Sequence, residues 1–586
     1  MKSAKKQKND MWDLLIPIMM ILVVLPLAVR LAIYSCGYSS YEWYSSDDVL
    51  SDFYCYYKSY LFDIIGIISA IILVFRLMLY KEKTKDFRIF LPLAGYGICV
   101  LLSTFCSVNP NASLKGNFES FESVIVLISY LIMALYAYQI MELERDYKYI
   151  WYSVLTISLL FVVIGGFQIF GHDLMQYEWM QRLLMTSEQF SSYGGEIENT
   201  FTGNNVYLTL YNPNYAGITL CMLFSLIWVM ALSESEKKRR IIYFILSAVM
   251  LTLIWFTYSR ASLLASILIL AISSLCFIKQ AKKTHIFIGL SAFALLLTVL
   301  ICIDALLDFK YLSRMLDKNT REPLTCMTSD ENGIHICYDD VNYDLYFEQN
   351  ALVCFSDERK ALPSVINTPG KDMILPFGSD NLAMFYENEI YLQIAENLLV
   401  FVMEDGSYLY ETPSGELAPM TAPEAVNLHG FEYLGSARGY IWSRTFPLLN
   451  DYLFIGSGPD TFAEVFPQTD YAGKLVYSDR PDMVIEKAHN DYLTKWVQTG
   501  GISLICLLVF YVLFVRHGFR FFFQKKTISG AVNTLQERLG LGCYIACLSY
   551  MLTSLFNDST LQTAPLFWVL CGVALSSMNI DKNGLS

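Results

Sequence analysis

The sequence predicts an all-α polytopic membrane protein with about 12 transmembrane helices and a small extracytoplasmic β-rich insert in the large loop. Three observations lead to this prediction. Mean hydropathy is +0.40. Only 17% of the residues are charged, whereas a soluble domain carries about 25% charge. Apolar residues come in uncharged blocks such as Ile241–Thr257, and about 20 apolar residues cross a bilayer core of roughly 30 Å.

The apolar blocks define the candidate spans. The first block has no small-residue cleavage site after it and is long enough to stay as an anchor. The spans are expected at residues 12–34, 60–80, 89–107, 120–141, 150–170, 213–233, 241–258, 261–279, 285–306, 491–515, 541–556 and 563–578.

Basic connections between the spans predict their orientation, because cytoplasmic loops are enriched in Lys and Arg. The Lys-rich start and every second connection would share one side. The basic connections are Lys81–Arg88, Lys237–Arg240, Lys279–Lys283 and Arg516–Lys526. We therefore expect both termini in the cytoplasm of a bacterium and the chain in its plasma (inner) membrane.

Three parts follow along the chain. Residues 1–306 carry spans 1 to 9, residues 307–490 form the large extracytoplasmic loop, and residues 491–586 carry spans 10 to 12. Within the loop, short alternating runs and turn pairs such as Asp405-Gly406 predict a β-rich insert over about 317–421. An amphipathic, helical return segment is expected over about 430–490.

Composition also excludes several classes of function. The formal net charge is −13, and the large loop is its most acidic part, so a nucleic-acid partner is not expected. No CxxC pair, Walker loop, HExxH or GxSxG pattern occurs, which disfavours a zinc site and ATP-dependent phosphoryl transfer. A disulfide between Cys326 and Cys337 is one possibility.

The first candidate functional residue is Arg260, in Tyr258-Ser259-Arg260-Ala261-Ser262. This segment joins two spans with almost no loop, so Arg260 is fixed at the outer membrane surface, where charge near hydrocarbon costs several kcal/mol. Its guanidinium suits bidentate binding of a phosphate. The alternative is an arginine that only reaches from the interface into water.

Two further arginines, Arg438 and Arg444, lie in the return segment with Trp442 between them. Two cations and a tryptophan suit a lipid headgroup as well as a substrate. Both interpretations stay open at this point.

The third candidate is His489, in Glu486-Lys487-Ala488-His489-Asn490-Asp491 at the outer end of the tenth span. A neutral imidazole takes a proton from a hydroxyl near neutral pH. Glu486 and Asp491 are near enough in sequence to orient it. The alternative is a hydrogen-bonded structural histidine. Asn557-Asp558-Ser559, in the last outer turn, is interpreted as a polar turn.

Five segments, in order, resemble motifs of the O-antigen ligase and polymerase family of GT-C type membrane glycosyltransferases. Ala replaces Gly in two of them, the second and the third, which makes the geometry beside each arginine a question for the structure. The segments are Asn212-Pro213-Asn214-Tyr215-Ala216-Gly217, Ser259-Arg260-Ala261-Ser262, Ser436-Ala437-Arg438 with Trp442, Gly456-Ser457-Gly458-Pro459-Asp460-Thr461-Phe462, and Ala488-His489-Asn490-Asp491-Tyr492-Leu493 with Gly500-Gly501.

The resemblance implies transfer of a glycan from an undecaprenyl-pyrophosphate donor to an acceptor hydroxyl, with inversion and with neither cofactor nor metal. Arg260, Arg438 and Arg444 would bind the pyrophosphate, with Asn214 and Asn490 as further substrate-binding residues. His489 would be the catalytic residue, acting as general base or holding the leaving pyrophosphate. The acceptor would be a glycan, a lipid or a protein. The lipid bilayer is the remaining partner.

Alternatives to this hypothesis exist within the family and in two other classes of protein, transporters and sensors. Within the family, the chain could be an O-antigen ligase, a polysaccharide polymerase or a protein O-oligosaccharyltransferase. A polytopic transporter or lipid-linked glycan flippase would carry mid-span charges and a repeat between halves, and both are scarce here. A sensor would need a cytoplasmic output domain, and none is evident.

Overall fold

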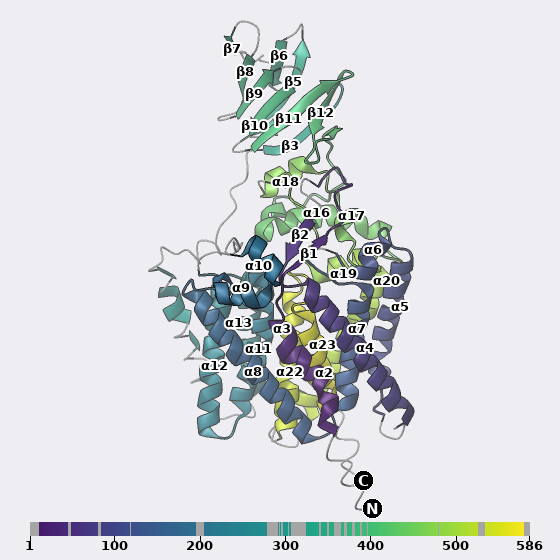
Figure 1. Cartoon of the computed structure of the whole chain (residues 1–586), viewed down its shortest axis with the longest axis vertical. Helices are drawn as coiled ribbons and strands as arrows, with labels where there is room; N and C mark the ends of the chain where they lie inside the picture. Colours follow the sequence, from purple (N-terminus) through teal and green to yellow (C-terminus); the bar gives the residue numbers. More distant parts are fainter. Residues whose placement is uncertain are drawn as a thin grey trace, which may run out of the picture.

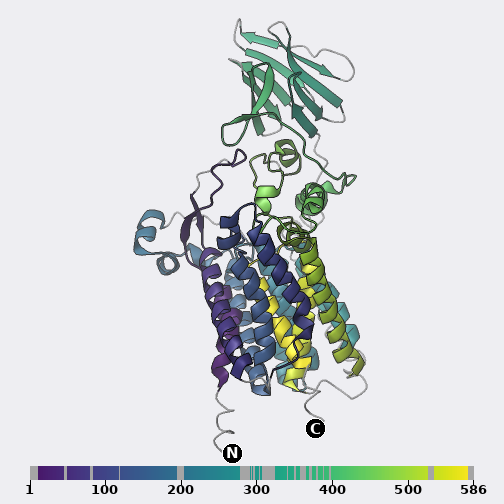
Figure 2. The ribbon, with the colours of Figure 1, turned by 90° about the vertical axis from the view of Figure 1, so that its right-hand side faces the viewer.

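The structure, a computed structural model of the whole chain, describes residues 11–578 with gaps. The gaps are residues 45–48, 80–83, 118, 195–203, 278–290, 292, 295–296, 303, 306–323, 339–340, 349–350, 357–364, 369–371, 378–380, 387–388, 395–396, 479 and 526–533. Figures 1 and 2 show a bundle of long helices with a group of strands beyond one end. The start of η1 and the end of α23 lie at the opposite end of the bundle.

The bundle consists of helices that run roughly parallel to its long axis (Figure 1). Their bounds are η1 Met11–Leu15, α2 Ile16–Met19, η2 Met20–Val24, α3 Leu25–Leu27, α4 Tyr56–Leu79, η4 Arg88–Phe90, α5 Leu91–Phe105, α7 Val124–Ile140, α8 Glu144–Ile169, α11 Pro213–Ser233, α12 Lys237–Phe256, α13 Arg260–Phe277, α20 Gly501–Phe519, η7 Arg520–Lys525, α22 Leu535–Thr553 and α23 Ala564–Met578.

Among the described residues, 6 helices are long and apolar enough to cross a membrane. Four shorter helices are also apolar. The long ones are Tyr56–Leu79, Arg88–Phe105, Glu144–Ile169, Pro213–Ser233, Lys237–Phe256 and Gly501–Phe523, and the short ones are Trp12–Leu27, Val124–Ile140, Arg260–Ser274 and Ala564–Met578. The prediction of a helical membrane protein is confirmed at this level, whereas the number of spans stays a prediction.

Two expected spans differ markedly from the helices in their limits. The first ends at Leu27 rather than at residue 34, because the chain then leaves the helix, the Arg30 N–H donates to the Phe53 carbonyl, and β1 begins at Ala32. The tenth is divided at Gly500, whose φ of 98° ends a short polar helix before α20 begins. The ninth, 285–306, falls partly outside the described residues.

Helix α11 lies at the centre of the bundle. In its most apolar stretch of 18 residues, 94% of the residues are buried, and α12, α13 and α22 pack against the helix. Pro213 opens the helix, and the Asn212 side chain accepts a hydrogen bond from the Asn214 N–H at 2.8 Å. This cap fixes the outer end of α11.

Shorter helices cover the end of the bundle that faces the strands (Figure 1). They are α6 Pro110–Lys115, η5 Leu174–Gln176, α9 Glu178–Leu184, α10 Ser187–Tyr193, η6 Phe431–Tyr433, α16 Leu434–Asp451, α17 Phe462–Val465, α18 Tyr471–Ser478 and α19 Asp491–Thr499.

The described strands pair in antiparallel order, each with its sequence neighbour. Two form a separate small sheet, four form a second sheet (β3-β4-β5-β6), and seven form a third (β13 to β7). Their bounds are β1 Ala32–Ser35, β2 Val49–Asp52, β3 Leu324–Ser329, β4 Ile334–Tyr338, β5 Val341–Glu348, β6 Ala351–Ser356, β7 Val365–Thr368, β8 Asp372–Phe377, β9 Asn381–Tyr386, β10 Glu389–Ile394, β11 Asn397–Glu404, β12 Ser407–Glu411 and β13 Leu417–Ala418.

The strands from β3 to β13 share one apolar core with helix α18. Leu345, Ile390 and Phe401 are fully buried in it, and the ring of Tyr410 is tilted against that of Tyr471 of α18, with ring centroids 5.0 Å apart. The strand group is therefore seated on the short helices rather than on the bundle itself. Figure 2 shows α18 between the two.

Candidate functional site

Arg260 is the first residue of α13, directly after the tight connection from α12. Ser259 Oγ lies 2.9 Å from Ser262 Oγ and stabilises the start of the helix. A side chain on Gly217 of α11 would collide with both serines, so this connection is pressed against the outer end of α11. Ala261 is inside a regular helix, where alanine is the best helix former, so its replacement of Gly causes no strain.

Arg438 comes from α16, which approaches the same place from the strand side. Its Nη2 donates to Asn557 Oδ1 at 3.3 Å. Burial lowers the pKa of Arg438; the carboxylate of Asp558 opposes this shift and the positive charge of Arg260 adds to it. Two of the three predicted arginines, Arg260 and Arg438, are therefore close enough for their charges to interact. Ala437 has a φ of 63°, a left-handed conformation that favours glycine.

His489 sits between the polar helix α19 and the segment that precedes it. Its side chain is 47% exposed, and its Nδ1 lies 2.7 Å from Oδ2 of Asp558. Trp442 Nε1 donates to the carbonyl of Ala488 at 2.8 Å and holds the neighbouring residue. Because Nδ1 contacts Asp558, Nε2 is the ring nitrogen left for a substrate hydroxyl.

Asp558 is the carboxylate that orients His489. It lies in the turn between α22 and α23 and is 1% exposed. Burial raises its pKa, but His489, Lys487 and Arg438 outweigh burial and hold the pKa of Asp558 below its usual value. Sequence analysis interpreted this segment as a polar turn. The signal that could have found it is an acidic residue in a short turn between two apolar helices.

The two carboxylates that seemed near enough to orient His489 have other partners. Asp491 is paired with Lys495 at 2.8 Å inside α19. Glu486 lies against Glu119, and burial together with that second carboxyl raises its pKa well above its usual value. The Tyr211 hydroxyl donates to Glu119. Chain proximity therefore indicated the wrong partners, because the orienting group comes from a distant turn.

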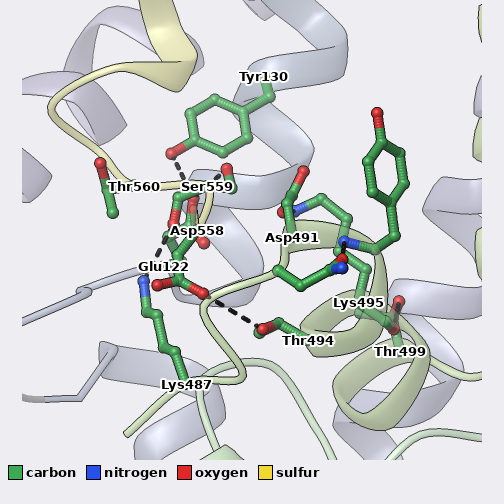
Figure 3. A network of polar contacts seen from close by, with 12 residues as sticks. Glu122, Tyr130, Lys487, Asp491, Thr494, Lys495, Thr499, Asp558, Ser559 and Thr560 are labelled. Atoms are coloured by element: carbon green, nitrogen blue, oxygen red, sulfur yellow. Dashed lines mark hydrogen bonds and ion pairs between the residues drawn. The ribbon is translucent and has the colours of Figure 1, made fainter. Parts of the chain in front are cut away.

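Asp558 belongs to a buried polar network (Figure 3). Lys487 Nζ donates to the Ser559 carbonyl at 3.0 Å, and Ser559 Oγ donates to Glu122 at 2.8 Å. Tyr130 donates a second hydrogen bond to Glu122 at 2.9 Å. Thr494 Oγ1 lies 3.5 Å from Asp558. These contacts join the start of α7, the α22–α23 turn and the His489 segment.

Arg444 belongs to a different group of residues. Its Nε donates to Asp470 at 2.9 Å, its guanidinium lies 4.6 Å from the Tyr440 ring centroid, and the Tyr440 hydroxyl also donates to Asp470. Within the described part of the chain, no hydrogen bond or ion pair joins Arg444 to His489. Arg444 is thus paired with Asp470 and not with the His489–Asp558 pair.

The two predicted asparagines lie at helix starts. Asn490 Oδ1 accepts from the N–H groups of Tyr492 and Leu493, so its side chain caps α19. Asn214 is half-buried in the first turn of α11. Substrate binding by either asparagine stays a prediction, although capping already accounts for the side chain of Asn490.

Metal-ligating residues do not gather in the described ranges, where no group of three or more His, Cys, Asp or Glu side chains could hold a metal ion. The site is instead made of two guanidiniums and an imidazole that contacts a buried carboxylate. Such a group binds an anion and accepts a proton from a hydroxyl.

The chain matches no protein-family model and no curated protein. The resemblance to the ligase and polymerase family therefore rests on the quoted motifs and stays a prediction.

Proposed function

We propose that the chain is an O-antigen ligase-like glycosyltransferase of the bacterial plasma membrane. It moves a glycan from an undecaprenyl-pyrophosphate donor to an acceptor hydroxyl on the extracytoplasmic face. The observation that supports this most strongly is the meeting of Arg260, Arg438 and the His489–Asp558 pair at one end of the bundle. Four segments that are far apart in sequence supply these groups.

The chemistry assigns a role to each group. The acceptor hydroxyl gives its proton to His489 Nε2 while its oxygen attacks the anomeric carbon of the donor from the face opposite the leaving group. The bond from that carbon to the pyrophosphate oxygen breaks, and undecaprenyl pyrophosphate leaves with the electron pair. Arg260 and Arg438 stabilise the charge that develops on it. Asp558 fixes the imidazole and stabilises its protonated form.

Topology is part of this proposal. We propose about twelve spans, with both termini in the cytoplasm and residues 307–490, with the β-rich insert, outside. The basic connections and the placement of all site residues at one end of the bundle support it. The test uses Glu416→Cys and, as its counterpart, Lys237→Cys, each in a chain whose native cysteines are serine. An impermeant thiol reagent should label only Glu416→Cys in intact cells, and the reverse pattern would refute the topology.

Activity is tested with purified protein, an undecaprenyl-pyrophosphate glycan and candidate acceptors. His489→Ala should lower the transfer rate by about 10³-fold, as expected for loss of a general base. Arg260→Ala should lower it by about 10²-fold through loss of charge stabilisation. His429→Ala is a matched control, because His429 also has a positive φ (54° against 49°) and is exposed. Arg480→Ala, on the surface, is the arginine control.

Each outcome separates the hypotheses. Equal turnover in the wild type and in both site variants would refute the site. No turnover with any donor, together with movement of lipid or solute across vesicles, would favour the transporter or flippase. The acceptor that becomes modified decides between ligase, polymerase and protein O-oligosaccharyltransferase.

A further inference from the structure

Lys487 is a buried lysine two residues before His489, with no role in the mechanism above. It is 5% exposed. Its Nζ donates to the Ser559 carbonyl at 3.0 Å, and Ser559 directly follows Asp558 (Figure 3). The lysine therefore holds the backbone of the turn that presents Asp558 to His489.

Four carboxylates surround this ammonium group and come from separate segments. They are Glu122 before α7, Asp460 before α17, the neighbouring Glu486, and Asp558. Burial alone lowers the pKa of a lysine, but these carboxylates outweigh it and raise the pKa of Lys487. Lys487 is therefore a permanent cation in this interior.

Asp558 is enclosed by groups from several elements. Cations face it from α16 (Arg438) and from the His489 segment (Lys487 and His489 itself). Tyr215 of α11 and Asp491 of α19 also interact with it. Of these cations, Lys487 is the one whose side chain also donates a hydrogen bond to the backbone of the turn that carries Asp558.

We propose that Lys487 is a positioning residue that anchors the α22–α23 turn and opposes proton uptake by the His489–Asp558 pair. Without this cation, a buried pair that contains a carboxylate takes up a proton more readily. The catalytic meaning of this role rests on the proposed function, whereas the charge effect itself does not.

The charge effect has a defined sign. His489 and Asp558 are in hydrogen-bond contact, so they take up a proton as a pair. A nearby cation opposes that uptake because the pair becomes more positive. Replacing Lys487 by a neutral residue should therefore shift proton uptake to higher pH, by about one pH unit.

The test measures the pair without any transfer reaction. His489 is 47% exposed, so diethyl pyrocarbonate reaches it and acylates the neutral imidazole. The rate of acylation at His489, followed by mass spectrometry from pH 5 to 9, gives the midpoint of proton uptake. Lys487→Gln removes the charge but keeps a hydrogen-bond donor for the Ser559 carbonyl. Lys487→Arg keeps both and should restore the wild-type midpoint.

Lys474→Gln is the matched control. Lys474 is also fully buried, and its Nζ also donates to a backbone carbonyl, that of Met483, at 3.0 Å. Its carboxylate neighbours are Asp470 and Asp482, not Asp558. The control should keep the wild-type midpoint.

A midpoint that is unchanged in Lys487→Gln, or displaced equally in Lys474→Gln, would overturn the proposal. Failure of the proposed function looks different, because the midpoint would still shift while no transfer occurs in the wild type. Where transfer is measured, the ascending limb of its pH profile should move with the same midpoint.

Discussion

The molecule contains two histidine–aspartate contacts of equal length in opposite surroundings. In the bundle, His489 Nδ1 lies 2.7 Å from Asp558, whose side chain is 1% exposed. In the four-stranded sheet, His335 Nδ1 lies 2.7 Å from Asp344, whose side chain is 55% exposed, and Asp330 contacts the other ring nitrogen at 3.2 Å. The distances alone do not distinguish a site from a surface pair.

The difference lies in what surrounds each carboxylate. Asp558 is removed from water and has Lys487 and Arg438 as charge neighbours, so each charge acts strongly on the others. Asp330 and Asp344 are in water, which screens their attraction for His335. The contact of His335 with exposed carboxylates is therefore weak, whereas the buried carboxylate of Asp558 interacts strongly with His489.

The largest expected effect comes from the two carboxylates compared directly. Asp558→Asn removes the charge that stabilises the His489 imidazolium and should lower transfer by about 10³-fold. Asp344→Asn should leave the rate unchanged. Initial rates at saturating donor measure both, and a comparable loss in the two variants would remove the distinction between buried and exposed pairs.

The same contrast between buried and exposed carboxylates predicts how much each of two ion pairs contributes to the stability of the fold. Arg444→Ala leaves Asp470, 3% exposed, as an unpaired buried charge and should cost about 3 kcal/mol. Arg182→Ala breaks an exposed pair with Glu178 and should cost less than about 1 kcal/mol. Denaturation of the purified chain in detergent compares them. Equal losses would mean that burial does not decide the strength of these pairs.

Sequence predicted the helical membrane class because hydropathy and span length depend on local composition. It also indicated Arg260 and Arg438 through charge at span ends. Arg444 is next to Trp442 in the chain, but its side chain lies on another side of α16, against Asp470. The position of a residue around the helix axis and the direction of its side chain determine which partner it contacts. A sequence motif contains neither.

The partner of His489 was beyond reach for a related reason. Asp558 is 69 residues away in the chain, and only the packing of α22, α23 and α19 brings the two together. The nearer candidates, Glu486 and Asp491, are occupied by Glu119 and Lys495. The tertiary fold determines which group lies beside each buried charge, because a buried charge is costly without a partner.

Two pairs of cysteines allow the same comparison between an exposed and a buried region, with reaction with an aqueous thiol reagent as the readout. Cys326 and Cys337 face each other across β3 and β4, and both are accessible free thiols. Cys547 and Cys571 are also in contact, but they are buried between α22 and α23. A mild aqueous disulfide reagent should bridge the first pair by thiol–disulfide exchange and spare the second.

Peptide mapping of the oxidised chain detects the bridges. A bridge between Cys326 and Cys337 should add about 2 kcal/mol of stability to the strands. Cys337→Ser removes both the bridge and the gain. Oxidation of Cys547 and Cys571 at the same reagent concentration would show that the bundle interior is open to solvent.

The smallest effect is expected from His335. Its hydrogen bond to Asp344 raises its pKa, burial opposes this, and Asp330 adds to the rise. Because the folded pKa is above the ordinary histidine value of 6.5, the contacts stabilise the sheet fully below that value. The contribution is lost as pH rises through the folded pKa. After discounting for solvent screening it is a few tenths of a kcal/mol.

Hydrogen–deuterium exchange of β4 and β5 in the wild type and in His335→Gln, compared at equal pH, measures this contribution. Protection in the variant should fall by less than about twofold at pH 5.5 and should match the wild type at pH 9. A tenfold loss at pH 5.5 would mean that the exposed pair behaves like the buried one. Surroundings would then fail to distinguish the His335 contacts from the His489–Asp558 contact.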